Sequence, residues 1–364
     1  MKYPDKNIKA EKFTAEMLPQ VSRTFNLAIK FLPKELSRSV GLAYLLCRIA
    51  DTYEDSDILN PSERQEMLLN YAALLDDCNH YDKDLVNSLE NAFVDCSQPR
   101  QPDSNQATAK NLQSADDLPS IRLVENLNLV LSSVNTLPAN HKKHIFNRAQ
   151  EMAKGMANYT MLASGRESNV CFLKDEADWD NYCYYVAGTV GHMLTDIFSD
   201  YAGFSDTARE KLHIFGRSFG IGLQKVNVLK DAVVDTKRGI CFLPQTFIDR
   251  YGVSFPQLSG TGSKGDLSGL VSAVVDVCRN HFQDSLEYIK IIPHKQLGLR
   301  MFLIVPVMLA AATMRLFSDY PQHLLEKGDI KLTRKDVWRL VRRSFYCKFS
   351  NRLLTYSFGK IYPG

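Results

Sequence analysis

Two groups of carboxylates in this 364-residue chain follow helical spacing. The first group contains Asp51, Glu54 and Asp55, and it follows Tyr44 and Arg48 at intervals of three or four residues. Side chains spaced in this way lie on one face of a helix. Carboxylate oxygens one turn apart suit Mg²⁺, which completes its shell with water and with the phosphate oxygens of a substrate. The alternative for this group alone is a solvated acidic helix end.

The second group is a polar ridge on a helix that is otherwise apolar. Its members are spaced by three, four and four residues and are Gln224, Asn227, Asp231 and Asp235. A polar ridge on an apolar helix must face water or a polar cavity. Basic residues flank the ridge and could neutralise phosphate oxygens, namely Lys225, Lys230, Lys237 and Arg238. The two groups together favour two sites for magnesium and a diphosphate.

Two further segments have side chains suited to a phosphorylated, apolar ligand. Ser22, Arg23 and Thr24 offer hydroxyls and a guanidinium, which suits phosphate, although the same residues could form a helix N-cap with a surface arginine. The segment 182–191 combines tyrosines with small residues. Tyrosines can line an apolar pocket, and small residues allow helices to approach or leave room for a ligand. The alternative there is ordinary aromatic core packing.

Helical periodicity dominates the rest of the chain and predicts an all-α fold with no strand series and no repeat. The expected helices are 39–55, 65–75, 84–93, 121–134, 141–164, 179–198, 206–234, 267–291, 296–317 and 335–346. We expect one domain over residues 1–364, with a flexible polar insertion at 97–118, where Pro, Ser, Asn and Gln gather.

Composition excludes several classes of protein. Charged residues make up 23% of the chain and the net charge is +3, so there is no general signal for nucleic-acid binding. The eight cysteines are scattered, which is typical of reduced thiols in a cytoplasmic protein. The polar N-terminus lacks the apolar stretch of a secretory signal. The longest apolar run, 301–314, contains Pro306 and predicts a buried core helix rather than a membrane span.

Four blocks, in this order, resemble the squalene and phytoene synthase family. They are 22–25, 44–55, 182–191 and 223–231, and the similarity spans roughly residues 15–320. The resemblance implies an isoprenoid synthase fold, in which helices surround a central apolar cavity and the two acidic motifs face each other at its mouth. It also implies two allylic diphosphate substrates, such as two molecules of farnesyl diphosphate.

The resemblance assigns roles to particular residues. It implies that magnesium, or alternatively Mn²⁺, is bound by Asp51, Glu54, Asp55, Asn227, Asp231 and Asp235. It implies that the substrate is held by Ser22, Arg23, Phe25, Arg48, Gln224, Asn227, Lys230, Phe302 and Pro306. Tyr182 would assist at the carbocation stage, and the aromatic faces of Tyr44 and Phe302 could stabilise the allylic cation.

The second motif departs from the family pattern at three positions. Val234 stands where an acidic residue is usual, and Lys230 stands where arginine is common. Lysine keeps the charge but loses the bidentate geometry of a guanidinium. Ile240 occupies a position that is often arginine in phytoene synthases. These departures weaken a phytoene product more than they weaken catalysis.

Three functions remain open from the sequence. The motifs favour a squalene synthase that reduces its intermediate with NADPH, for which Lys331 and Arg334 are the candidate contacts. The alternative is a phytoene- or dehydrosqualene-type synthase without a reductant, since the segment Ala187–Gly191 is shared with bacterial carotenoid-type enzymes. The third is a non-catalytic member that acts in assembly or binding, which would predict eroded metal motifs. The oligomeric state is not indicated.

The C-terminal segment 337–345 is basic and amphipathic. It could rest on an anionic membrane surface, which would suit release of a very apolar product. The alternative is a helix packed on the domain with its charges in water.

Overall fold

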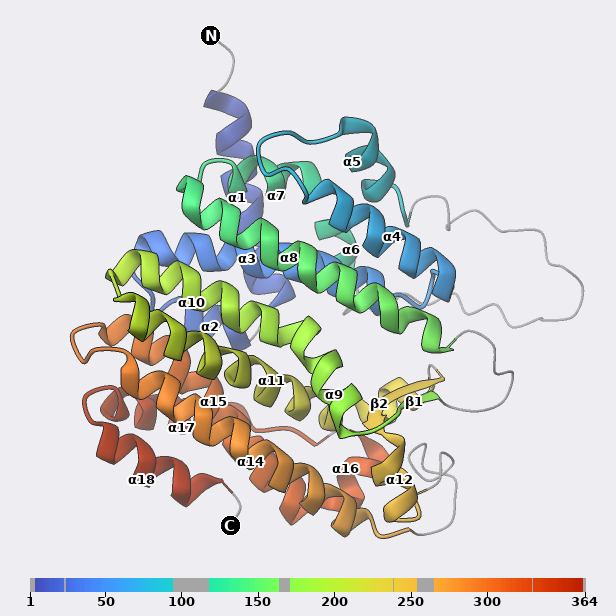
Figure 1. Ribbon diagram of the computed structural model, residues 1–364, viewed down its shortest axis with the longest axis vertical. Helices are drawn as coiled ribbons and strands as arrows, with labels where there is room; N and C mark the ends of the chain where they lie inside the picture. Colours follow the sequence, from blue (N-terminus) through green and yellow to red (C-terminus); the bar gives the residue numbers. More distant parts are fainter. Residues whose placement is uncertain are drawn as a thin grey trace, which may run out of the picture. The chain divides into compact units, whose positions relative to one another are not determined.

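The computed structural model describes residues 4–22, 24–93, 118–163, 171–237, 239–253, 265–328 and 330–362. Most of this part of the chain is helical, which confirms the all-α prediction (Figure 1). Internal contacts divide the chain into two compact units, one of Met1–Asn26 with Arg38–Met161 and one of Leu27–Ser37 with Leu162–Gly364. The single domain over 1–364 stays a prediction, and the expected insertion at 97–118 lies outside the described residues except for Leu118.

The first unit is entirely helical in its described part. Its helices are α1 (Pro4–Val21), the greater part of α3 (Lys34–Glu54), α4 (Pro61–Leu74), α5 (Lys83–Glu90), α6 (Leu118–Val124), α7 (Leu127–Val134) and α8 (Ala139–Thr160). The short helix α2 (Thr24–Ile29) begins in this unit and ends in the other. The helix expected over 121–134 is two helices, because the chain turns at Glu125 and Asn126.

Buried tyrosines fix α3 to its neighbours. The Tyr71 hydroxyl of α4 donates to the Leu46 carbonyl at 2.9 Å, and the Tyr53 hydroxyl donates to the Leu89 carbonyl of α5 at 3.0 Å. Both tyrosines are fully buried, and a buried hydroxyl is costly without such a partner. The C-terminal half of α3, which carries the first acidic motif, is therefore held firmly within this unit.

The second unit is built from nine α-helices in its described part. They are α9 (Glu176–Cys183), α10 (Thr189–Ala202), α11 (Asp206–Lys237), α12 (Gln245–Arg250), α14 (Leu267–Ile291), α15 (Leu297–Asp319), α16 (Pro321–Lys327), α17 (Arg334–Cys347) and α18 (Asn351–Ile361). The longest of them are α11, α14 and α15. The central helix α11 packs against both α10 and α14 (Figure 1).

This unit also contains a small sheet that the sequence did not predict. The strands β1 (Cys171–Leu173) and β2 (Ile240–Pro244) pair in parallel, with Cys171 opposite Ile240. The sheet does not change the all-α class, and it arises because two short apolar segments, far apart in sequence, pair across the end of α11. A run of three to five residues is too short to show a period of two.

Glycines allow α10 and α11 to approach closely. A Cβ atom on Gly191 would collide with the Gly216 carbonyl, and one on Gly220 would collide with the Ala187 carbonyl. Of the two uses proposed for the small residues of 182–191, close helix approach is the one the geometry supports. The crossing fixes the position of α11, and with it the polar ridge.

We expect Gly191→Ala to lower the free energy of unfolding by about 3 kcal/mol, because two helix backbones must separate to admit the methyl group. Urea denaturation measures this change. Gly359→Ala is the matched control, since a methyl group added to Gly359 of α18 would meet no atom within 4 Å. That control should gain up to about 1 kcal/mol from helix propensity. Equal stabilities for the two variants would contradict the close crossing.

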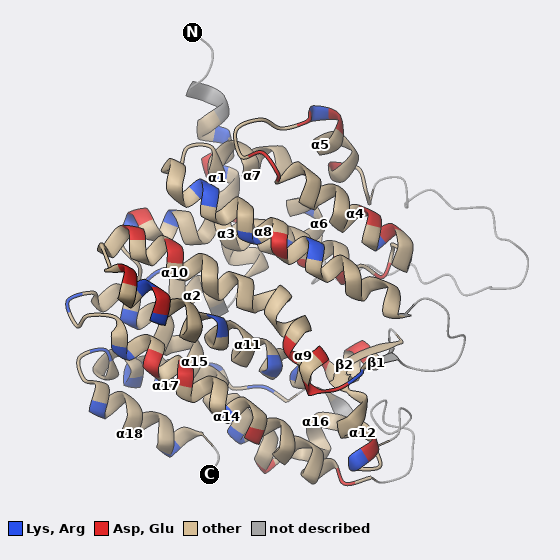
Figure 2. Cartoon of the chain, in the orientation of Figure 1, with Lys and Arg blue, Asp and Glu red and all other residues tan. Residues whose placement is uncertain are grey.

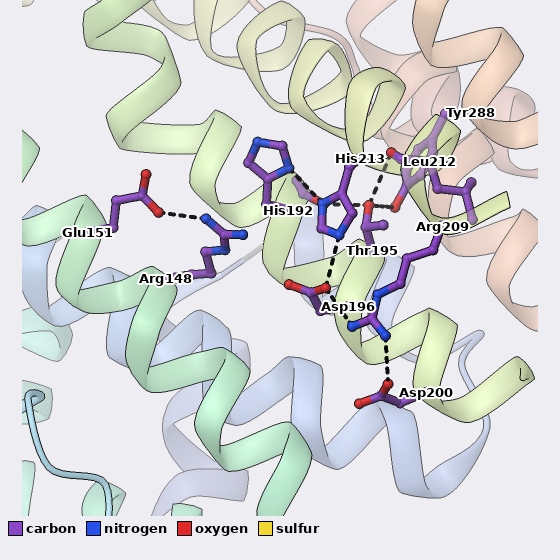
Figure 3. A network of polar contacts seen from close by, with 11 residues as sticks. Arg148, Glu151, His192, Thr195, Asp196, Asp200, Arg209, Leu212, His213 and Tyr288 are labelled. Carbon is purple, nitrogen blue, oxygen red and sulfur yellow. Dashed lines mark hydrogen bonds and ion pairs between the residues drawn. The ribbon is translucent and has the colours of Figure 1, made fainter. Parts of the chain in front are cut away.

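A polar network joins the start of α11 to α10 (Figure 3). Asp196 accepts from the Arg209 guanidinium at 2.8 Å and lies 3.0 Å from His213 Nε2. The Nδ1 atoms of His213 and His192 are 2.9 Å apart, so one ring donates and the other accepts. Such a network offsets the cost of burying Asp196 and locks the two helices in register.

The helix α15 contains the apolar run predicted to be a core helix. Within the described residues it alone is long and apolar enough to cross a membrane, and most of that stretch is buried inside the structure. Leu303, Ile304 and Met308 have no exposed surface. Pro306 is tolerated inside this helix, which bears out the prediction of a buried element despite the proline.

Candidate functional site

The first acidic motif occupies the last turn of α3. Arg48 Nη1 lies 3.9 Å from Asp51 Oδ2, and both side chains keep 29% of their surface exposed. The Arg48 guanidinium also donates from Nε and Nη2 to the Ser120 hydroxyl, at 3.3 and 3.2 Å. Arg48 is therefore oriented by α6 beside Asp51, and it leaves this carboxylate within reach of a ligand.

Burial raises the pKa of Asp51 to about 7, although the Arg48 charge lowers it, and Asp55 adds a further rise. The positive charge that the protein places near Asp51 does not fully offset the cost of burying this carboxylate in its charged form. A bound cation would supply the missing positive charge. The electrostatics of Asp51 thus fit a cation ligand better than a solvated surface acid.

The other two carboxylates of this motif take different directions. The Glu54 side chain is buried, whereas Asp55 is exposed and lies just beyond the last residue of α3. The helix thus ends one residue earlier than predicted. The structure therefore does not bring Asp51, Glu54 and Asp55 onto a single face.

The first block of the resemblance lies next to this motif within the same unit. The Ser22 hydroxyl accepts from the Asn26 backbone N–H at 3.2 Å, so it caps α2, as the alternative interpretation had it. Tyr44 donates to the Val21 carbonyl at 3.0 Å, and burial raises its pKa. The rings of Tyr44 and Phe25 lie 5.9 Å apart. Arg23 lies outside the described residues.

The polar ridge of α11 is present in the second unit. The side chains of Gln224, Asn227, Asp231 and Asp235 are all partly or fully exposed, while Val226, Val228, Leu229 and Ala232 are buried. The Asn227 amide donates to Gln224 Oε1 at 3.4 Å, and Lys230 Nζ lies 3.1 Å from Asp231 Oδ2. The helix therefore presents oxygen ligands and one ammonium along a single line.

Val234 interrupts this line where the family usually has an acid. Its side chain is 45% exposed, which is unusual for valine beside carboxylates. Among the described residues, no three His, Cys, Asp or Glu side chains gather closely enough to hold a metal by themselves. The first motif offers Asp51 and Asp55 and the second offers Asn227, Asp231 and Asp235, so a Mg²⁺ ion at either motif would complete its shell with water and substrate phosphates.

Lys225 does not flank the ridge as predicted. It is fully buried, with Nζ 2.5 Å from Asp180 Oδ1 of α9 and 4.4 Å above the Trp179 ring. The prediction failed because Lys225 is spaced four residues from Ile221 and from Leu229, which places it on the apolar face. This spacing was the signal in the sequence that could have predicted the burial of Lys225.

The Lys225–Asp180 ion pair extends to α14. His281 Nε2 lies 3.8 Å from the same Asp180 oxygen. Burial alone would raise the pKa of Asp180, but His281 and Lys225 lower it to about 2. The pair fixes α9, and α9 carries Tyr182.

Tyr182 is buried and stacks on Phe242 of β2, with ring centroids 4.1 Å apart and planes within 5°. The five residues that follow α9, Tyr184–Gly188, form a π-helical turn between α9 and α10. Such turns recur at functional sites, since they displace a helix by part of a turn. The sequence predicted that Tyr182 belongs to the site but did not indicate that Phe242 of β2 would stack on it.

The remaining predicted site residues lie elsewhere in the second unit. Phe302 is fully buried and packs edge-on against Phe198, with ring centroids 5.6 Å apart, and Pro306 is buried one turn further along α15. Lys331 and Arg334 are exposed, the second at the start of α17. The implied apolar cavity that Phe302 and Pro306 would line stays a prediction.

Solved structures define the class of protein to which this fold belongs. A complex of TcSQS with the ligand E5700 matches with a TM-score of 0.72 and 21% identity, over 96% of this chain and 90% of that one. A dehydrosqualene synthase matches with a TM-score of 0.59 and 19% identity, over 93% and 97% of the two chains. The fold is therefore the all-α isoprenoid synthase fold.

The chain belongs to the squalene/phytoene synthase family, whose model matches residues 18–336. Curated relatives include the squalene synthases of Ganoderma lucidum and Saccharomyces cerevisiae. They are 26% and 27% identical over 90% of this chain and over 65% and 66% of their own lengths. The chain thus spans just under two thirds of the length of these relatives. The resemblance drawn from the four sequence blocks is confirmed.

Proposed function

We propose that this protein condenses two molecules of farnesyl diphosphate head to head, through presqualene diphosphate, to squalene. The observation that carries this proposal is the polar ridge of α11, where Asn227, Asp231 and Asp235 keep exposed surface on a part of the helix that is rich in buried apolar residues. Family membership and the similarity to named squalene synthases support the same activity.

The residues present fit magnesium. The donors Asp51, Asn227, Asp231 and Asp235 are oxygen ligands with exposed surface, and the raised pKa of Asp51 favours a bound cation. Bound Mg²⁺ would neutralise charge on the departing diphosphate. We propose that Arg48 and Lys230 hold diphosphate oxygens, because each is a cation placed beside a candidate metal ligand.

The reaction also requires that a carbocation be stabilised and shielded from water, and aromatic side chains meet this requirement. Loss of diphosphate breaks the C1–O bond, takes the electron pair with the leaving group and leaves an allylic cation. The faces of Tyr182, Tyr44 and Phe302 could stabilise this cation and exclude water. Attack by the double bond of the second substrate forms a C–C bond and a new cation, and loss of a proton to a base closes the ring and gives a cyclopropyl diphosphate. A second ionisation with hydride transfer to carbon then gives squalene.

The product test separates the candidate functions. Purified protein is incubated with farnesyl diphosphate and Mg²⁺, with and without NADPH. We expect squalene only when NADPH is present. A conjugated hydrocarbon formed equally with and without NADPH, and no squalene in either case, would establish the synthase without reductant instead. Absence of diphosphate release would contradict both enzymatic functions and favour a binding role.

We propose that Lys331 and Arg334 contact the phosphates of NADPH, since both are exposed cations close together in sequence. The double variant Lys331→Gln, Arg334→Gln should raise KM for NADPH by about tenfold or more through the loss of charge-assisted hydrogen bonds. Formation of presqualene diphosphate without NADPH should not change. An unchanged KM for NADPH would remove these residues from the reductant site.

A further inference from the structure

The helices α17 and α18 leave a cluster of large apolar side chains in solvent. Five of the seven large aromatic side chains that are exposed in the described part of the chain lie here: Trp338, Phe345, Tyr346, Phe349 and Tyr356. Trp338 is 64% exposed and Phe349 is 53% exposed. Exposed aromatics scattered singly need no explanation, but a contiguous group marks an interaction surface.

The exposed face of α17 is separate from the face that packs on the protein. Leu340 and Val341 are buried against Met301, Val305 and Leu309 of α15. Trp338 and Phe345 are seven residues apart and lie on one side of α17, at the edge of the buried stripe, and Phe349 lies two residues beyond the last residue of the helix. The helix is therefore secured by one apolar stripe and carries a second stripe that its own unit does not cover.

Three of the exposed rings are in contact. Phe345 lies 6.0 Å from Tyr346 and 5.9 Å from Phe349 between ring centroids. Lys348 Nζ lies 3.6 Å above the Phe345 ring and 4.9 Å from that of Phe349. Apolar surface and positive charge are thus interleaved in one small area.

The charge of this region is strongly positive. Between Arg334 and Tyr362 there are eight lysines and arginines and one acid, Asp336. Lys and Arg recur along both helices (Figure 2), and Arg339, Arg342 and Arg352 are exposed. Asp336 is already engaged by Thr333, to whose hydroxyl it lies at 2.6 Å. A partner must therefore be apolar and negatively charged.

We propose that the exposed face of α17 and α18 docks on an anionic lipid bilayer, with Trp338, Phe345 and Phe349 entering the headgroup region. A bilayer satisfies both demands, since rings enter the interface while basic side chains meet lipid phosphates and carboxylates. A second copy of this chain would bring the same positive face against itself. This inference does not depend on the proposed reaction, although a membrane would accept a hydrocarbon product.

Vesicle flotation tests the proposal on the full chain. The protein should bind phosphatidylcholine vesicles that contain about 30% phosphatidylserine, and bind pure phosphatidylcholine far more weakly. Binding should shift Trp338 emission to the blue, because Trp179, the other tryptophan of the chain, is already buried. Failure to float with anionic vesicles would overturn the proposal.

Two variants separate the apolar and the electrostatic contributions. Trp338→Ser, Phe345→Ser, Phe349→Ser should lower vesicle affinity about 100-fold, and Arg339→Gln, Arg342→Gln about 30-fold with a weaker dependence on salt. Ile214→Ser is the matched control, as Ile214 is 66% exposed on α11. Circular dichroism checks that all variants fold.

Other partners give different results. Self-association that the triple variant abolishes, without any vesicle binding, would assign the face to a second copy. Tighter binding to a single-stranded oligonucleotide than to anionic vesicles would assign it to nucleic acid. Either result overturns the membrane proposal.

Discussion

Asp51→Asn is expected to lower diphosphate release from farnesyl diphosphate by about a thousandfold. An amide at this position cannot supply the negative charge that a bound cation needs, so the leaving group loses its electrostatic stabilisation. Steady-state turnover with saturating Mg²⁺ measures the loss. Asp231→Asn should have an effect of similar size, because Asp231 is one of the two carboxylates of the ridge on α11.

Asp51→Asn should lower the activity of the protein without lowering its stability. Burial raises the pKa of Asp51 to about 7, so the folded, metal-free protein gains nothing from this charge. Asp51→Asn should therefore unfold at the same temperature as the wild type or higher. Asp84→Asn, an exposed acid in the first turn of α5, is the matched control and should keep full activity. Full turnover in either the Asp51 or the Asp231 variant would refute the metal-ligand assignment.

Asp180→Asn is expected to lower the free energy of unfolding by about 2–3 kcal/mol. Breaking a buried ion pair leaves an uncompensated charge, here the ammonium of Lys225, which has no exposed surface. The figure lies below the full cost of a buried pair because Asp180 is 38% exposed and water can partly replace it. Urea denaturation at neutral pH measures the change.

A double variant tests whether the ion pair itself is responsible. Lys225→Met, Asp180→Asn removes both charges and keeps most of the length of the lysine stem, so it should recover at least half of the lost stability. Glu287→Gln is the matched control for a surface pair, since Glu287 is 50% exposed and lies 2.7 Å from Lys290. It should cost less than about 1 kcal/mol. Additive effects of the two single changes would contradict a coupled pair.

The same pair predicts a dependence on acid. His281 and Lys225 lower the pKa of Asp180 to about 2 in the folded protein, while the unfolded value is about 3.9. A depressed folded pKa contributes stability above the unfolded value, and this contribution is lost as the pH falls from about 4 towards 2. The difference in stability between wild type and Asp180→Asn should therefore shrink over that range. A difference that stays constant with pH would contradict the assigned pKa.

Local spacing was sufficient to predict the all-α fold and the ridge on α11. Gln224, Asn227 and Asp231 share a face wherever that helix lies, because the period of 3.6 residues belongs to the backbone itself. The same argument gave the buried helix around Pro306. It failed for β1 and β2, whose pairing joins segments about seventy residues apart.

The sequence predicted less well which charged side chains of each helix point into the core. Lys225 and Glu54 both carry charge, and the sequence analysis assigned both to the ligand. Each is spaced three or four residues from buried neighbours, Lys225 from Val228 and Glu54 from Ala50, and both side chains are buried. A charge on the apolar face is held by a partner on another helix, and for Lys225 that partner, Asp180, is 45 residues away.

The sequence by itself thus determined the residue types and their order on each helix, and these define the family and the two acidic motifs. Only the tertiary structure decided that Lys225 points inward, that Tyr182 stacks on Phe242, and that the aromatic face of α17 remains uncovered. The physical reason is range. Helical periodicity is set by neighbours within four residues, whereas burial depends on which distant helices and strands pack against each face.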